Sequence, residues 1–374
     1  MISDQELDRR WALTRTAMAH AGIDWLIAPT GHPFGYMRWL TGRTGFAGTL
    51  AAIPISGNVL LASHGDHIHH RPHDSYGIRH FSSCAQANIK CDNQVAILVD
   101  AIQATKPKRI GLLGMGYLSA SAYLALQAAF PNVAFSDQSE LLVPLKAVKS
   151  EEELGYMRRA AAMHDSGVDV IKKVAKPGIT ARDVMEEVRF MLFKAGSTAQ
   201  TLMAGSAPPG SICKYAGPGD RIMQPGDQFA MLIEACEQEG YYSEAMPTLC
   251  FGKVPPGLQR VFDDVVEAQN ILADMLKPGV TPIELMEAND KFMDRKGYPR
   301  EGRLLGHAQG VDLVERPALS PLGDNLPFEE NMVVSLHPTT HADDAWGYPV
   351  NMSFLVTKNG AKRMLKTPQE IIVL

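Results

Sequence analysis

The sequence predicts an α+β protein of two domains, an N-terminal α/β domain over residues 1–147 and a larger domain over residues 148–374. Three observations support this. The length of 374 residues exceeds what one hydrophobic core usually covers. The first part alternates short apolar stretches with amphipathic ones. The second part contains an internal repeat, so we expect two related halves there.

The N-terminal domain is expected to alternate helices with strands. Amphipathic or apolar helices are expected over residues 6–21, 95–105 and 118–130, and strands over residues 25–28, 50–53, 59–62 and 109–113. Ser56 and Gly57 separate the second strand from the third, and this pair is typical of a hairpin turn.

A new helix is expected at the start of the second domain. Residues 146–153 are rich in lysine and glutamate, and Ser150 and Glu153 have the spacing of a capping box. We therefore expect a long helix to begin at Ser150, with the domain boundary just before it.

The repeat consists of the pentapeptides at 176–180 (Lys-Pro-Gly-Ile-Thr) and 277–281 (Lys-Pro-Gly-Val-Thr), with matching flanks and no gap. In each copy we expect a helix to end at the glycine, which tolerates the left-handed conformation. The threonine is then expected to cap the next helix, with Asp183 or Glu284 as its capping partner. The likeness of the copies favours two related halves with a cleft between them.

Composition excludes several classes of partner. The hydrophobic share of 45% and the charged share of 21% are ordinary, the net charge is −5, and no block of lysine and arginine occurs. These values argue against a nucleic-acid or membrane partner. No apolar run approaches the ~20 residues that cross a bilayer, and the polar N-terminus lacks the pattern of a signal peptide. The five cysteines have no metal-type spacing. We therefore expect a cytoplasmic protein.

Several short motifs follow one another along the chain. They lie at 40–42 (Leu-Thr-Gly), 224–227 (Gln-Pro-Gly-Asp), 240–243 (Gly-Tyr-Tyr-Ser), 306–307 (Gly-His), 331–338 (Asn-Met-Val-Val-Ser-Leu-His-Pro) and 347–360. Their order and spacing resemble the creatinase, prolidase and aminopeptidase P superfamily, peptidase M24. The resemblance implies a creatinase-type N-terminal domain followed by a pita-bread catalytic domain. It also implies a homodimer and a small-molecule substrate.

Peptidases of that superfamily hold two divalent ions with two aspartates, one histidine and two glutamates. The matching positions in this sequence are, in that order, Ile233 or Glu234, Glu244, His307, His337 and Asn351. Only the histidine is kept. Two dications at close range repel each other and need anionic bridges. Because Asn351 replaces one bridge, we do not expect a two-metal site.

The remaining side chains favour either of two kinds of site. Glu244, His307 and His337, with Asn351 beside them, could hold one Fe, Mn or Zn ion, because a carboxylate with two imidazoles is a known ligand set for these metals. The alternative is a metal-free site like that of creatinase, in which histidine and carboxylate transfer protons directly.

Further candidates follow from position and from the resemblance. Glu234 lies in an apolar run and is a candidate general base, because a buried carboxylate is costly. Glu315 is either an acid/base group or the ion-pair partner of Arg316. Val314 stands where the family has its substrate-side histidine. The candidate substrate-binding residues are Lys214, Tyr215, Tyr242, Asn351 and Arg38.

Two N-terminal clusters have alternative interpretations. Arg38 lies in an aromatic-rich segment with Tyr36 and Trp39, which resembles the family segment that caps the cleft, although packing explains it equally well. The histidine-rich stretch 64–80 is interpreted as a solvated loop rather than a metal site.

These observations predict a creatinase-like hydrolase or lyase that acts on a C–N or related bond of a small polar metabolite. Creatine itself is disfavoured, because Lys214 and Tyr215 stand where creatinase has its catalytic histidine. One alternative is a metal-dependent Xaa-Pro dipeptidase or aminopeptidase, which a bound metal pair would indicate. A second alternative is a ligand-binding protein without catalysis, whose cleft would lack titrating groups.

Overall fold

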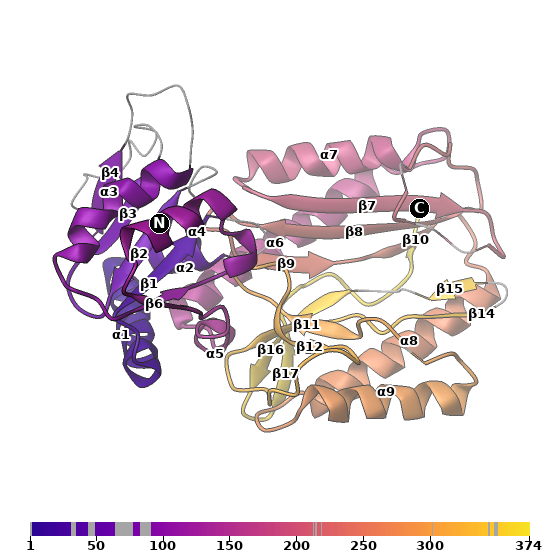
Figure 1. Ribbon diagram of the computed structural model, residues 1–374. Helices are drawn as coiled ribbons and strands as arrows, with labels where there is room; N and C mark the ends of the chain where they lie inside the picture. Colours follow the sequence, from indigo (N-terminus) through magenta and orange to yellow (C-terminus); the bar gives the residue numbers. More distant parts are fainter. Residues whose placement is uncertain are drawn as a thin grey trace. The chain divides into compact units, whose positions relative to one another are not determined.

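The computed structural model describes residues 2–30, 35–43, 49–63, 78–82, 91–211, 213, 215–217, 219–300, 302–342, 345–347 and 351–374. The chain forms two compact units, Met1–Lys146 and Ala147–Leu374 (Figure 1). Each unit has its own sheet and its own hydrophobic core.

The first unit is built on a six-stranded mixed sheet with the order β4-β3-β2-β1-β5-β6. Its strands are β1 (Trp25–Pro29), β2 (Leu50–Pro54), β3 (Val59–Ser63), β4 (Ile78–Ser82), β5 (Arg109–Leu112) and β6 (Ala134–Asp137). β2 and β3 pair antiparallel, which confirms the predicted hairpin at Ser56 and Gly57. The helices are α1 (Asp4–Ala21), α2 (Tyr36–Thr41), α3 (Cys91–Gln103), α4 (Ala120–Ala129) and α5 (Val143–Ala147).

The aromatic segment of the first unit contributes to its core. Trp39 on α2 is fully buried. The guanidinium of Arg10 lies 5.3 Å from its ring centroid and donates a hydrogen bond of 2.9 Å to its carbonyl oxygen. Packing therefore explains Trp39, while Arg38 is half-buried. Of the predicted histidine-rich loop, His80 lies on β4 and not in a loop, because residues 78–82 pair with β3. The others, His64, His67, His69, His70 and His73, lie outside the described residues.

The second unit is built on a ten-stranded sheet with the main order β12-β11-β13-β16-β9-β8-β10-β18, in which β17 also pairs with β16 and β7 with β8. Its strands are β7 (Gln200–Ala207), β8 (Gln228–Cys236), β9 (Tyr242–Ala245), β10 (Thr248–Cys250), β11 (Gly306–Ala308), β12 (Glu315–Leu319), β13 (Val333–Leu336), β16 (Met352–Thr357), β17 (Gly360–Arg363) and β18 (Ile372–Val373). A separate pair is formed by β14 (Thr340–Ala342) and β15 (Ala345–Gly347).

Four helices cover this sheet in two pairs. α6 (Glu151–Val174) and α7 (Ala181–Lys194) contact β7, β8 and β9, whereas α8 (Pro256–Met275) and α9 (Pro282–Lys296) contact β12, β13 and β17 (Figure 1). Each pair has its own apolar cluster against the sheet. The unit thus consists of two helix-and-strand halves, as the repeat predicted.

The two copies of the repeat make the same contacts. Thr180 and Thr281 cap α7 and α9, and each forms a complete capping box, as does Ser150 at the start of α6. Gly178 donates its N–H to the Met223 carbonyl at 2.9 Å. Gly279 in the other copy donates to the Phe328 carbonyl at the same distance of 2.9 Å.

One detail of the repeat was predicted wrongly. α6 ends at Val174 and α8 ends at Met275, so both helices stop before the glycine. Gly178 and Gly279, with φ of 93° and 88°, lie instead in the turn that leads to the next helix. The proline before each glycine explains this, because it disfavours helical geometry in the residue that precedes it. Among the described helices, none is long and apolar enough to span a membrane.

Candidate active site

Two strands from the first half of the second unit present two glutamates to each other. Glu234 on β8 and Glu244 on β9 are directly opposite in the antiparallel pair. Residues in such a pair project to the same face of a sheet at close range. Glu244 is buried and Glu234 is half-buried. The sequence left Ile233 or Glu234 open as the match for the first family aspartate, and the strand register puts Glu234 beside Glu244.

Two histidines come from the other half. His307 lies on β11, and His337 follows directly after β13, which pairs with β11. The backbone N–H of His337 donates to the Leu305 carbonyl at 3.0 Å and continues the ladder. The two imidazole rings lie 5.4 Å apart between centroids and are tilted by 58°.

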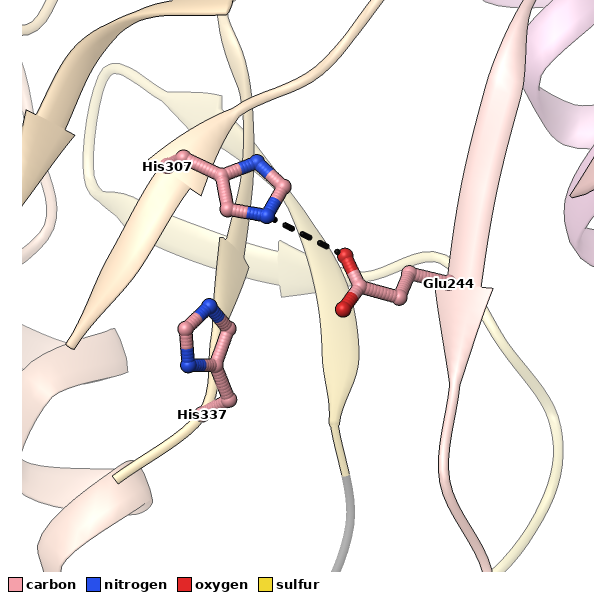
Figure 2. A group of neighbouring side chains, drawn as sticks. All are labelled: Glu244, His307 and His337. Atoms are coloured by element: carbon pink, nitrogen blue, oxygen red, sulfur yellow. Dashed lines mark ion pairs between the residues drawn. The ribbon is translucent and has the colours of Figure 1, made fainter. Parts of the chain in front are cut away.

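Glu244, His307 and His337 point toward one another (Figure 2). One donor atom of each lies within 4.8 Å of those of the other two. Nε2 of His307 is 3.4 Å from Oε2 of Glu244, and the three residues are exposed by 5% or less. The predicted convergence of these side chains is therefore present in the structure.

This donor set fits one divalent ion. It offers one carboxylate and two imidazoles, a combination found at single Fe, Mn and Zn sites. Nδ1 of His307 lies 3.0 Å from the Ala308 carbonyl oxygen. A carbonyl there favours the tautomer with hydrogen on Nδ1, and that tautomer leaves the Nε2 lone pair facing the site.

A second ion fits poorly, because both polar groups of the Asn351 side chain already form hydrogen bonds within the protein. Its amide nitrogen donates to Oε1 of Glu244, and its amide oxygen accepts from the Ser335 hydroxyl. The amide is neutral, and its oxygen faces Ser335 rather than the two histidines. It therefore does not supply the anionic bridge that a pair of dications requires.

Glu244 is held by a hydrogen-bond network that the sequence did not reveal. Nε2 of Gln309 donates to Oε2 of Glu244 at 2.8 Å. The Ser353 hydroxyl donates to Oε1 of Gln309 at 2.7 Å. Gln309, Ser335 and Ser353 are fully buried. One feature of the sequence could have indicated Gln309. It lies two residues after His307, and alternate residues of a strand project to the same face of the sheet.

The carboxylate of Glu244 and the imidazole of His307 favour each other's charged form. Burial raises the pKa of Glu244, but the hydrogen bond and charge of His307 and the charge of His337 bring that pKa below its ordinary value. Burial lowers the pKa of His307, but the hydrogen bond and charge of Glu244 raise it above its ordinary value. Without an ion, Nε2 of His307 and Oε2 of Glu244 lie 3.4 Å apart, and each group stabilises the charged form of the other.

Glu234 and His337 are shifted toward their neutral forms. Burial, the charge of Glu244 and a hydrogen bond with it raise the pKa of Glu234 to about 9. Burial, with a smaller contribution from the charges of His307 and Arg303, lowers the pKa of His337 to about 4. In the metal-free protein at neutral pH, Glu234 is therefore protonated and the His337 imidazole is neutral.

Glu315 has a partner that was not predicted. Its Oε2 accepts a hydrogen bond of 2.7 Å from Nζ of Lys149, and both side chains are buried. The Arg316 guanidinium, which the sequence offered as an alternative ion-pair partner of Glu315, bonds to Asp324. An ion pair with Lys149 was missed because 166 residues separate the partners in sequence.

The candidate substrate-binding residues are dispersed. Tyr215 is half-buried against a small apolar cluster that includes Leu232 and Met246. Tyr242 is buried, and its N–H donates to the Gly310 carbonyl at 2.8 Å. Lys214 lies outside the described residues, and Arg38 belongs to the first unit. Val314, at the position of the family's substrate-side histidine, is 49% exposed.

A further buried histidine supports the strand of Glu234. On α6, Nδ1 of His164 lies 2.6 Å from the Ala160 carbonyl oxygen, and its Nε2 accepts a hydrogen bond of 3.2 Å from the Ala235 N–H. Burial lowers the pKa of His164, which fits a neutral ring that donates at Nδ1 and accepts at Nε2. His164 thus fixes the backbone next to Glu234.

Comparison with known proteins gives the same two-part organisation. Residues 155–358 match the model of metallopeptidase family M24, and residues 10–148 match that of the creatinase/prolidase N-terminal domain. The solved X-Pro aminopeptidase of Thermotoga maritima superposes with a TM-score of 0.82 and 19% identity, over 97% of this chain and 99% of that one. The predicted fold, a creatinase-type domain followed by a pita-bread domain, is confirmed.

Sequence relatives carry the names of hydrolases and peptidases. The uncharacterized hydrolase/peptidase y4tL of Sinorhizobium fredii is 25% identical over an alignment of 383 residues, which covers 99% of this chain and 97% of that protein. The Xaa-Pro dipeptidase of Lactobacillus delbrueckii subsp. lactis is 26% identical over 261 residues, which cover 69% of this chain and 70% of that protein.

Proposed function

The chain belongs to metallopeptidase family M24, and we propose that it is a hydrolase that holds one divalent ion and cleaves the amide bond of a dipeptide-like small molecule. The single observation that carries the proposal is the buried donor set of Glu244, His307 and His337, with donor atoms within 4.8 Å of one another. The dipeptidase named among its relatives supports the substrate class.

This proposal changes the main expectation from sequence. The relatives favour the peptidase alternative over the creatinase-like metabolite hydrolase, and none of those compared supports a lyase. The non-catalytic alternative expected a cleft without titrating groups, whereas Glu234, Glu244 and two histidines meet in this site.

Glu244, His307 and His337 would hold the ion, with Fe, Mn and Zn as the matching metals. When bound there, a divalent ion would polarise the scissile carbonyl and make water a better nucleophile at neutral pH. His337 is ready to serve as a ligand because its pKa is lowered to about 4. His307 is oriented for the same role by the Ala308 carbonyl oxygen, 3.0 Å from Nδ1.

Proton transfer is assigned to Glu234. It is half-buried, so substrate and water can reach it. Burial and the charge of Glu244 raise its pKa to about 9 in the metal-free protein, and a divalent ion bound to Glu244 would offset the second cause. During hydrolysis, the attacking water loses a proton as its oxygen bonds to the scissile carbonyl carbon, and the leaving nitrogen gains a proton as the C–N bond breaks. The Glu234 carboxylate would accept the first proton and then, as the carboxylic acid, donate it to the nitrogen. The carboxyl group ends the cycle unchanged, as general acid–base catalysis requires.

The test is an assay of chelator-treated protein before and after addition of Mn²⁺, Fe²⁺ or Zn²⁺. The substrates are dipeptides with and without proline in second position, with creatine as a non-peptide comparison. We expect hydrolysis of dipeptides only after metal is restored. Hydrolysis of creatine or another non-peptide C–N bond alone would overturn the substrate class. His20→Ala, on an exposed surface of α1, is the matched control for histidine substitutions in the site.

A metal-free acid–base hydrolase is the second candidate, and the buried contact between Glu244 and His307 favours it. The 3.4 Å contact between Nε2 and Oε2 would let the imidazole exchange a proton with the carboxylate directly. Full dipeptidase activity in the presence of excess chelator would select this candidate over the first.

A further inference from the structure

Two neutral amides meet the carboxylate of Glu244, one on each oxygen. Gln309 donates from Nε2 to Oε2 at 2.8 Å, and Asn351 donates from Nδ2 to Oε1. The other end of each amide accepts a hydrogen bond from one serine hydroxyl, and we call each set of serine, amide and carboxylate an arm. Ser353 donates to Oε1 of Gln309 at 2.7 Å, and Ser335 donates to Oδ1 of Asn351.

The direction of these hydrogen bonds follows from the charge of Glu244. An ionised carboxylate can only accept, so each amide must turn its NH₂ group toward it. The amide oxygen then faces the serine, which must donate. Each arm is therefore a hydroxyl–amide–carboxylate relay with one favoured orientation, because a flipped amide would turn its oxygen toward the carboxylate and lose that hydrogen bond.

The strand register aligns the two arms. Ser335 on β13 is paired with Ser353 on β16, and His307 on β11 is paired with Ser335. Ser353 also accepts the Glu244 backbone N–H at 3.3 Å. The arm through Gln309 thus closes a ring that begins and ends on Glu244, and hydrogen bonds in such a ring polarise one another.

We propose that Gln309 and Asn351 are positioning residues, each oriented by its serine, which hold the Glu244 carboxylate in one rotation for an ion shared with His307 and His337. This inference rests on the proposed function. Without the two amides, the Glu244 carboxylate can rotate toward His307. Its oxygens would then contact the imidazole and would no longer be available to bind the ion. Amides are suited to this task because they donate hydrogen bonds without a charge that would repel a dication.

The test is a double-mutant cycle with two readouts. Gln309→Leu, Ser353→Ala and the double variant are titrated with Co²⁺ by calorimetry after chelator treatment. Loss of a residue that orients a ligand typically weakens metal binding about 10- to 100-fold. We expect each single variant to show such a loss. We expect the double variant to match Gln309→Leu within about twofold, because both changes break one relay.

The arm through Ser335 and Asn351 provides a comparison for the arm through Ser353 and Gln309. Ser335→Ala combined with Gln309→Leu breaks both relays, so the losses in Co²⁺ affinity should multiply rather than overlap. Ser166→Ala and Gln127→Leu, on exposed helix surfaces, are the matched controls and should leave Co²⁺ binding unchanged. Multiplying losses for Gln309 with Ser353, or an unchanged affinity in Ser353→Ala, would overturn the relay.

The second readout separates this proposal from the proposed function. Unfolding free energies of the same variants are measured in metal-free protein, where the relay predicts that the losses from Gln309→Leu and Ser353→Ala do not add. If the wild type binds no Co²⁺, the single-ion function fails, and this cycle alone decides the relay. Additive losses in metal-free protein would then overturn it.

Discussion

The two halves of the second unit share a frame and differ in chemistry. α6, α7 and their strands repeat the arrangement of α8, α9 and theirs, down to the capping boxes at Thr180 and Thr281. The first half contributes carboxylates, Glu234 and Glu244, whereas the second contributes imidazoles and amides. Residues that maintain the frame are thus repeated, and residues that do chemistry are not.

The largest expected effect tests the carboxylate half. Glu234→Gln keeps the size of the side chain but cannot act as an acid or base. We expect kcat for dipeptide hydrolysis to fall about 10²- to 10⁴-fold. Co²⁺ affinity should change little, because Glu234 is not among the three proposed ligands. A variant that keeps its kcat would contradict the role of Glu234.

The next effect tests the contact between the two halves, where the Lys149–Glu315 pair joins the segment just before α6 to β12. Lys149→Met leaves Glu315 buried without its cation, so the unfolding free energy in urea should fall by about 3–5 kcal/mol. Replacing both residues, as Lys149→Met with Glu315→Leu, should recover most of this loss. An equally unstable double variant would show that the pair stabilises through something other than charge compensation.

In metal-free protein, a fall in pH should change the contributions of His337 and Glu234 to the unfolding free energy in opposite directions. His337 has a folded pKa of about 4. Between pH 4 and its unfolded pKa near 6.5, only the unfolded state binds this proton. Stability from this group is therefore lost as pH falls, by about 1.4 kcal/mol per pH unit.

Glu234 gives the reverse dependence, because its folded pKa is about 9 and its unfolded pKa is near 4.5. Between these values only the folded state holds the proton, so this group lowers stability as pH rises. Urea unfolding across pH should show a weaker acid loss in His337→Gln and a weaker alkaline loss in Glu234→Gln. Parallel pH profiles for wild type and both variants would refute the assignment.

The smallest effect tests the likeness of the halves. Thr180→Ala and Thr281→Ala each remove a helix cap that makes the same contacts, so each should lower the unfolding free energy by about 1 kcal/mol. The measurement is urea unfolding of both variants side by side. Losses that differ by more than about 0.5 kcal/mol would show that the two caps are not equivalent in energy.

The features that could be predicted from the sequence are mainly those that depend on local patterns of residues. The capping boxes depend on residues three positions apart and were predicted correctly, whereas the helix ends within the repeat were not. The meeting of Glu244, His307 and His337 was predicted from motif order, and the structure places them together. The arms through Gln309 and Asn351 were missed because they depend on the pairing of β11, β13 and β16. A slip of one residue there would send each side chain to the opposite face.

The most direct test of the central claim is the metal content of the purified protein, by elemental analysis, for the wild type and for His337→Ala. One divalent ion per chain is predicted in the wild type, with loss of that ion in His337→Ala, because His337 supplies one of three ligands. Two ions per chain, none, or one ion retained in His337→Ala would contradict a single ion held by Glu244, His307 and His337.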